Sequence, residues 1–333
     1  MQSVLHTSFD KRIMEILTQE GVEMEAVSTK EMSHIEWLQL RQSGLGGSDA
    51  GTVLGFNSHK TPYQLYLEKT GQYEEIVDNE AVYWGNELEE KVAQEFAKRT
   101  GKKVRRQNQF LRHSKYSFMT ANLDRVVVGE KALLECKTAH EYLKEAWSGD
   151  EIPASYLCQL HHYLAVTGYE KAYIAVLIGG NKFVWKEVER DEEFIQILIE
   201  REKAFWENHV LAGVAPPIDG SDAACEMLKK MYPEDDGTAI MLTKEDETIL
   251  DALEVISEEI KSLETQKKAY ENQLKLKLES ATEAHSPRHK LTYKTITSNR
   301  IDSKKLKEEA PEVYEKYTKP SSSRRLIIKK LGA

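Results

Sequence analysis

The segment ANLDRVVVGEKALLECKT, residues 121–138, contains Asp124, Glu135 and Lys137, whose side chains could act together. The pattern predicts two short apolar strands joined by a turn at Gly129. Side chains alternate along a strand, so Glu135 and Lys137 project from one face while Cys136 points away. Asp124 belongs to the neighbouring strand and can fold back against that face. The segment therefore predicts two carboxylates and one amine converging at a strand end.

Carboxylate oxygens suit Mg²⁺, which keeps several waters and shares its coordination shell with a substrate phosphate. Such a metal acidifies a bound water and stabilises charge on phosphoryl oxygens during in-line attack. We predict that Asp124, Glu135 and the backbone carbonyl of Cys136 hold the metal. Lys137 is expected to hold that water or help to deprotonate it. This spacing also occurs by chance, and the alternative for these residues is a surface hairpin carrying ordinary salt-bridging charges.

Five segments of the chain occur in a characteristic order. They are LRQSGLGGSDAGTVLG, KTPYQLYLEKTG, WGNELEEKVAQEF, ANLD…LLECKT and YLCQLHHYLAVTG. Together they resemble the YqaJ-type phage recombination nucleases, which are relatives of lambda exonuclease in the restriction-endonuclease-like PD-(D/E)XK superfamily. The resemblance covers roughly residues 30 to 215. It implies an α/β fold in which helices flank a mixed sheet, with the metal site at the strand ends.

The WGNELEEKVAQEF segment places Leu88, Val92 and Phe96 at helical spacing, so these residues are expected to face the core. Glu89 lies beside that apolar stripe, where an acid is ordinarily a solvated surface charge. The resemblance implies instead that Glu89 points into the active site and joins Asp124 and Glu135 as a metal ligand.

The YLCQLHHYLAVTG segment places Gln159 and Tyr163 four residues apart on one helical face. A glutamine on a helix is normally a neutral surface residue. The resemblance implies that Gln159 lies beside the scissile phosphate and its water, with Tyr163 as a further DNA-binding residue. His161 and His162 point about 100° apart on a helix, and we expect them at the helix surface or an interface rather than on a metal.

The RQSGLGGSDAG segment carries three glycines within residues 44–47, which allow backbone conformations that expose N–H groups. Ser48 or Asp49 can cap the helix that follows, and Arg41 supplies a fork that grips a phosphate through two bonds. The alternative is a plain turn and helix cap. The resemblance implies that Arg41 and Ser48 bind the 5′-terminal phosphate of the digested strand, which predicts an end-dependent exonuclease.

The composition limits the class of protein. The three cysteines show no CxxC spacing, which argues against the iron–sulfur members of the superfamily. The first residues lack a signal pattern, and no run of about 18 apolar residues occurs, so we expect a cytoplasmic protein with no membrane span. The formal charge of −9 hides a basic end, because residues 286–333 hold 13 Lys or Arg against 5 Asp or Glu. VRRQNQFLRHSKYS is a second basic strip.

Periodicity and turn residues divide the chain into five expected parts. These are a helical lead-in (1–30), the nuclease domain (31–215), a linker (216–242), a long amphipathic coiled-coil helix (243–285) and a basic α+β tail (286–333). A capping box at residues 28–31 predicts a helix that ends near Gln42. SSSRRLIIKK is expected to close the tail as a strand. The tail is expected to hold duplex DNA or to dock a partner protein.

We therefore expect a nuclease that uses Mg²⁺ or Mn²⁺, with two ions per site, to digest linear double-stranded DNA from 5′ to 3′ and leave 3′ single-stranded tails. The resemblance implies a RecT-like single-strand annealing protein as partner and a homo-oligomer, a ring trimer. Three alternatives stay open: a structure- or sequence-specific endonuclease, a non-catalytic DNA-binding scaffold, and a chain whose main function is interaction through its long helix and tail.

Overall fold

The structure is a computed structural model that describes residues 25–73 and 80–330. The chain divides into two units, Met1–Met231 and Tyr232–Ala333. Within the described residues, no helix has the length and hydropathy needed to cross a bilayer.

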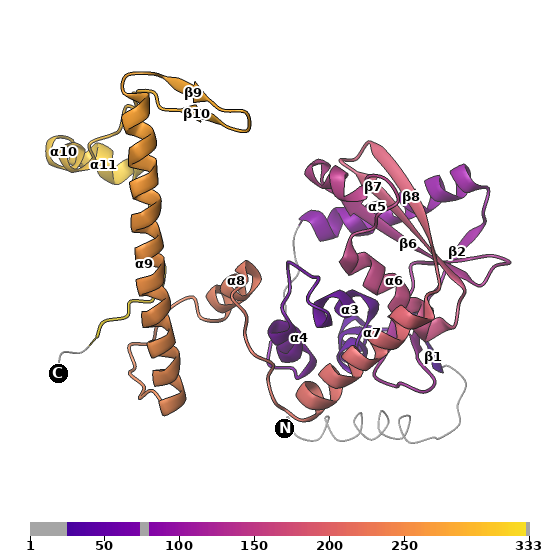
Figure 1. Cartoon of the computed structure of the whole chain (residues 1–333). Helices are drawn as coiled ribbons and strands as arrows, with labels where there is room; N and C mark the ends of the chain where they lie inside the picture. Colours follow the sequence, from indigo (N-terminus) through magenta and orange to yellow (C-terminus); the bar gives the residue numbers. More distant parts are fainter. Residues whose placement is uncertain (1–24, 74–79, 331–333) are drawn as a thin grey trace. The chain divides into compact units, whose positions relative to one another are not determined.

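A five-stranded mixed sheet forms the centre of the first unit (Figure 1). Its strands, in sheet order, are β2 (Val104–Arg106), β5 (Arg125–Val127), β6 (Ala132–Ala139), β7 (Lys171–Ile178) and β8 (Lys182–Glu189). Only β6 and β7 are parallel to each other; the other neighbouring pairs are antiparallel. The expected strand pair around residue 129 is confirmed, as is the mixed sheet.

Helices cover both faces of this sheet. The chain leaves β6 through the 3-10 helix η1 (Glu141–Trp147) and returns to β7 through α6 (Ala154–Thr167), because a parallel pair needs a crossover connection. Leu133 of β6 lies in the core cluster with α6, whereas Leu134 packs with α5 (Glu80–Thr100) on the other side. The alternation of β6 therefore turns Glu135 and Lys137 toward α6.

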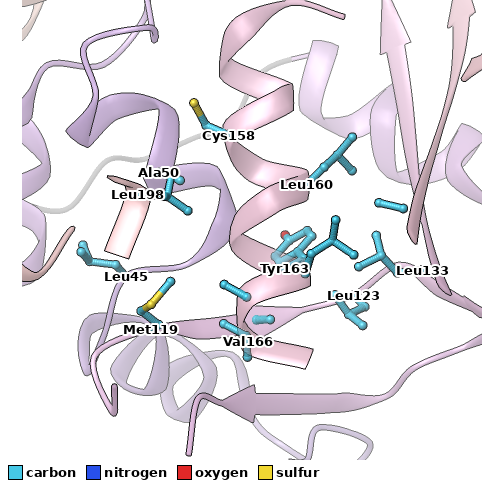
Figure 2. Packing of buried hydrophobic residues seen from close by; sticks show 14 of the residues in the cluster. Leu45, Ala50, Met119, Leu123, Leu133, Cys158, Leu160, Tyr163, Val166 and Leu198 are labelled. Atoms are coloured by element: carbon cyan, nitrogen blue, oxygen red, sulfur yellow. The ribbon is translucent and has the colours of Figure 1, made fainter. Parts of the chain in front are cut away.

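A second sheet and further helices surround α6. The sheet has the order β1 (Glu25–Ser28), β3 (Gln109–Arg112) and β4 (Thr120–Asn122), all antiparallel. The helices are α2 (His34–Gln42), α3 (Gly47–Val53), α4 (Pro62–Lys69), α7 (Glu192–Phe205), the π-helix η2 (Trp206–Leu211) and α8 (Asp222–Met231). Figure 2 shows Leu160, Tyr163 and Val166 of α6 among buried side chains from these elements.

The second unit is built on α9 (Lys244–Leu278), a 35-residue helix. Thr243 caps its first turn by a capping box with Asp246. The remaining elements are β9 (Glu283–His285), β10 (Lys290–Thr292), α10 (Ser303–Glu309) and α11 (Pro311–Tyr317). The long helix was expected to run to residue 285, but it ends at Leu278 and residues 283–285 form a strand with β10.

Other expectations were wrong where long-range pairing decided the structure. Of the expected helical lead-in, residues 1–24 lie outside the described residues, and residues 25–28 form β1 because they pair with β3. The capping box lies at Ser33 and Glu36, not at residues 28–31. Residues 321–330 form no strand, because they have no neighbouring strand to pair with in the described structure. α8 lies within the segment expected as linker.

His161 and His162 are buried, so the expectation of a surface position was also wrong. Nδ1 of His162 lies 2.8 Å from Oε1 of Glu202 on α7, and Nε2 lies 2.8 Å from the carbonyl oxygen of Thr120 on β4. Burial alone would lower the pKa of His162, but the Glu202 carboxylate raises it above its ordinary value. Burial raises the pKa of Glu202 as well, although His162 opposes this. Both shifts favour a proton on this pair, and its contacts join α6, α7 and β4.

We predict that Glu202→Gln destabilises the chain by about 3 kcal/mol at pH 6, because His162 loses its buried partner. A raised pKa in the folded state gives stability that is present below the ordinary histidine pKa and is lost as pH rises through the folded value. The difference in melting temperature between wild type and variant should therefore be largest at pH 6 and shrink toward pH 8. Calorimetry across this range measures it.

Glu200→Gln, at an exposed position of the same helix, is the control and should show no such difference. An equal melting temperature for Glu202→Gln and wild type at pH 6 would show that the pair contributes nothing to stability.

Candidate active site

The site is centred on the carboxylate of Glu135, which β6 holds in the interior. Its Oε1 lies 2.7 Å from Nζ of Lys137 and accepts a hydrogen bond of 2.7 Å from Nε2 of Gln159 on α6. The same Nε2 donates to the hydroxyl of Tyr163, 3.0 Å away and one turn further along α6. The strand alternation and the i, i+4 spacing of the helix thus bring together four of the predicted residues.

Asp124 immediately precedes β5 and turns back toward β6. Its Oδ2 accepts a hydrogen bond of 2.9 Å from the backbone N–H of Cys136, between Glu135 and Lys137. Burial and the nearby charge of Glu135 raise the pKa of Asp124 to about 8, although Lys137 and the Cys136 N–H oppose the shift. Two buried acids this close repel each other, and a bound cation relieves that repulsion.

The second carboxylate oxygen of Glu135 is evidence that a metal ion binds at this position. Oε2 is buried and has no hydrogen-bond partner. An unpaired buried carboxylate oxygen is costly, and metal coordination is one of the ways in which proteins satisfy it. Asp124, Glu135 and the carbonyl of Cys136 between them offer the hard oxygen ligands that Mg²⁺ and Mn²⁺ prefer. These residues fit a divalent metal.

Glu89 lies near this site, but another group binds its carboxylate. Arg125, the residue after Asp124, forms ion pairs with Glu89 at 2.5 Å and with Glu90 at 2.8 Å. Nη1 of Arg125 also donates to the carbonyl oxygen of Asp124. Within the described part of the chain, no group of three or more His, Cys, Asp or Glu residues is arranged to hold a metal. The structure therefore does not bring Glu89 together with the other two acids, and its ligand role stays a prediction.

Lys137 is held as a cation. Burial alone would lower its pKa, but the charges of Glu135 and Asp124 raise it above the ordinary lysine value. The ring of Tyr156 lies 5.3 Å from Nζ and adds a cation–π contact. An ammonium group in this place can hold a water or a phosphate oxygen through its N–H donors.

The predicted phosphate-binding residues also meet. Nη2 of Arg41 donates to Oγ of Ser48 at 3.5 Å, and the guanidinium lies over the ring of Trp37. Of the two residues proposed to cap α3, Asp49 does so, because its Oδ2 accepts from the N–H of Gly46. The Ser48 hydroxyl therefore stays beside Arg41 as part of a polar surface.

Tyr163 connects this polar surface to the carboxylates. A Cβ atom on Gly47 would lie 2.4 Å from Cε1 of Tyr163, so only glycine lets α3 approach α6 this closely. The phenol hydrogen-bonds to Gln159, which reaches Glu135. Burial and the nearby carboxylates Glu135 and Asp124 raise the pKa of Tyr163 well above its ordinary value, which keeps the hydroxyl neutral. Gly47, next to Ser48 in the chain, therefore packs against the tyrosine whose hydroxyl reaches Glu135 through Gln159.

Sequence reasoning missed two residues that support the site. Lys69 forms a buried ion pair of 2.7 Å with Asp49, and its Nζ also donates to the carbonyl oxygen of Arg41. It lies in KTPYQLYLEKTG, one of the five segments of the resemblance. Arg125 follows Asp124 directly in the sequence. Its position next to an expected metal ligand could have indicated that it lies near the site. A cavity of about 320 Å³ adjoins Lys69 and Arg41.

The fold and the site define a mixed α/β protein with two carboxylates and a lysine gathered on its central strands. A family model described as a YqaJ-like viral recombinase domain matches residues 36–170. The YqaJ protein of Bacillus subtilis (strain 168) is 49% identical over 306 residues, which cover 91% of this chain and 96% of that protein. The chain belongs to the YqaJ-like viral recombinase family. The resemblance drawn from the five segments is confirmed, and all five lie inside the matched residues.

Two solved structures are more distant. An alkaline exonuclease from Laribacter hongkongensis is 19% identical with a TM-score of 0.47, and the match covers 59% of this chain and 97% of that one. A phage related exonuclease from Haemophilus somnus 129PT is 14% identical with a TM-score of 0.40, and the match covers 59% and 100% of the two chains.

We predict that Mn²⁺ raises the melting temperature of the wild-type protein and that Asp124→Asn abolishes this rise. A ligand at one hundred times its dissociation constant stabilises by about 2.7 kcal/mol. The metal-free variant should melt at or above the wild-type temperature, because it loses the repulsion between Asp124 and Glu135. A Mn²⁺ titration followed by differential scanning fluorimetry measures both effects.

Glu87→Gln changes an exposed acid on α5 and serves as the control, with a full response to Mn²⁺ expected. An undiminished response in Asp124→Asn would mean that the metal binds elsewhere.

Proposed function

We propose that this chain is a metal-dependent nuclease that hydrolyses phosphodiester bonds of DNA. The single observation that carries the proposal is the buried Glu135, with Lys137 and Gln159 on one oxygen and no partner on the other. Membership of a viral recombinase family supports DNA as the substrate.

Mg²⁺ or Mn²⁺ is the proposed cofactor, with two ions per site as the resemblance implies. Asp124, Glu135 and the carbonyl of Cys136 would hold it, and Glu89 would join them after leaving Arg125. When bound, the metal lowers the pKa of a water and stabilises charge on the phosphoryl oxygens.

The protein side chains position the reacting groups. Lys137, as an ammonium group, donates hydrogen bonds to the attacking water or to a phosphate oxygen, and Glu135 fixes its direction. Gln159 presents its amide next to the same carboxylate, and Tyr163 limits the movement of that amide. Two donors held by packed elements need little reorganisation when charge develops on the phosphate.

Arg41 and Ser48 are proposed to bind the 5′-terminal phosphate of the digested strand. Their contact with each other brings together a guanidinium and a hydroxyl, two groups that donate hydrogen bonds to phosphate oxygens, and this supports the proposal. Tyr163 and Gly47 connect them to the carboxylates, which supports cleavage at a short distance from the bound end. This arrangement favours 5′ to 3′ digestion of linear duplex DNA, which leaves 3′ single-stranded tails.

The assembly is proposed from the resemblance alone. A ring trimer of the nuclease unit would enclose the duplex, and a RecT-like single-strand annealing protein would receive the 3′ tail.

Lys137→Ala is predicted to lower the rate of Mg²⁺-dependent hydrolysis of linear duplex by at least about a hundredfold, because a positioned donor at the reacting phosphate is lost. A time course on end-labelled linear DNA, with and without Mg²⁺, measures the effect. Lys131→Ala removes an exposed lysine from the same hairpin and should retain wild-type activity.

Unchanged hydrolysis in purified Lys137→Ala would disprove the enzyme proposal for this site. The non-catalytic scaffold would then be the better explanation.

Arg41→Ala is predicted to remove the preference for 5′-phosphorylated ends. The wild-type enzyme should digest phosphorylated duplex about tenfold or more faster than dephosphorylated duplex, because charged hydrogen bonds to a phosphate are about 1.5–3 kcal/mol each. Paired assays on the two substrates measure this ratio. Arg99→Ala, on the exposed face of α5, should keep the wild-type ratio.

Covalently closed circular duplex serves as the third substrate. If the wild-type protein cleaved it as fast as the linear form, the end-dependent mechanism would be replaced by an endonuclease.

A further inference from the structure

One face of α9 carries an apolar seam that the rest of the described second unit leaves exposed. Its apolar members follow alternating spacings of three and four, with one position between Leu263 and Tyr270 held by a lysine. They include Leu253, Ile256, Ile260, Leu263, Tyr270 and Leu274, whose exposed fractions lie between 39% and 66%. Such a seam is the contact surface of a coiled coil. Its side chains need a second helix to exclude water from them.

The basic tail contacts α9 at a different position. Nζ of Lys330 forms an ion pair of 2.8 Å with Glu254, which is not a seam residue. The tail residues Leu326 and Ile327 are themselves 85% and 65% exposed, so they do not cover the seam. Figure 1 shows α9 as one uninterrupted helix over its whole length.

The charges of α9 are separated along its length. Residues 244–259 contain seven acidic residues and one lysine, whereas residues 260–278 contain five lysines and two glutamates. Two copies in parallel would place acid against acid and lysine against lysine. Two antiparallel copies would place the acidic half of each helix beside the basic half of the other, which is favourable.

Lys267 independently favours the same orientation. It occupies the seam position between Leu263 and Tyr270, so a parallel pair would bring two Lys267 side chains together in the interface. A charged residue at one seam position selects register and orientation in this way. In an antiparallel pair, Lys267 instead faces Ile256 of the other copy, where Glu259 lies within reach of its amine.

The seam is symmetric about its centre, between Ile260 and Leu263. Reversing one copy pairs Ile260 with Leu263, Ile256 with Lys267 and Leu253 with Tyr270. The next layer pairs Ile249 with Leu274. In heptad notation, each layer joins an a position of one copy to a d position of the other, as antiparallel packing requires. In this register every apolar seam residue lies opposite another apolar residue, except Ile256, which lies opposite Lys267.

We propose that α9 binds a second copy of this chain as an antiparallel two-helix coiled coil in this register. The partner is the chain itself. When one copy of α9 is reversed, its apolar seam meets the seam of the other copy, and its acidic half lies beside the basic half of the other copy. The pairing is independent of any ring formed by the nuclease unit, since α9 belongs to a separate unit.

Cysteine cross-linking of the full-length chain tests the orientation. Cys225 is exposed and is first replaced by serine, whereas Cys136 and Cys158 are buried. One variant then carries Ile249→Cys and another Leu274→Cys, and the two are mixed and mildly oxidised. A disulfide needs the two Cβ atoms about 4 Å apart. Positions 249 and 274 are separated by about 37 Å along one helix, at 1.5 Å per residue.

The expected result is a disulfide-linked mixed dimer in at least tenfold excess over the dimers formed by either variant alone. Linkage of Ile249→Cys to itself would show a parallel pair and overturn the proposal. Absence of a cross-link in the mixture would overturn it as well.

Sedimentation equilibrium of the full-length chain tests the association itself. Replacing Ile256 and Leu263 together by aspartate should halve the particle mass, whereas Ser262→Asp with Thr265→Asp, on the outer face, should leave it unchanged. Lys267→Leu should tighten the association at least tenfold and also allow parallel cross-links. A wild-type particle whose mass equals that of the Ile256→Asp, Leu263→Asp variant would overturn the proposal, and so would association that needs a different protein.

Hydrolysis of a short linear duplex is measured in parallel for every variant. It should be unchanged, because none of these positions belongs to the proposed active site. A nuclease failure therefore remains distinguishable from a failure of pairing.

Discussion

The structure of the site depends on how the buried carboxylate of Glu135 is satisfied. A charge in the interior is stable only when charged or polar groups surround it. Lys137 and Gln159 share Oε1, while Oε2 has no partner. The donors come from β6 itself and from α6, so the carboxylate joins the central strand to the crossover helix. The oxygen left free is the place where the site can accept a cation.

Residues of α6 contribute both to the stability of the fold and to the candidate active site. One side of the helix presents Gln159 and Tyr163 to the carboxylates. Another side presents His162, which bonds to Glu202 on α7 and to the backbone of β4. Because these contacts lie on adjacent residues, the position of α6 that satisfies the histidine also sets the position of the glutamine amide.

The two units differ in how they use charge. In the first unit, the central charges are buried and paired, as in Asp49 with Lys69 and Glu135 with Lys137. In the second unit, the charges of α9 are exposed and ordered along the helix, where they select a partner and its orientation rather than stabilise the fold. The net charge of −9 describes neither arrangement, because it sums over both.

Local periodicity was enough to predict the strand pair around residue 129, the common face of Glu135 and Lys137, and a long helix that begins close to residue 243. Those features follow from the alternation of side chains along a strand and from the repeat of apolar residues along a helix. Only the tertiary structure decided that Glu89 pairs with Arg125, 36 residues away, that His162 is buried on Glu202, and that residues 25–28 join a sheet. The physical reason is that a charged side chain or a strand edge pairs with whichever partner folding brings near. The spacing of residues in the sequence does not indicate which distant partner that is.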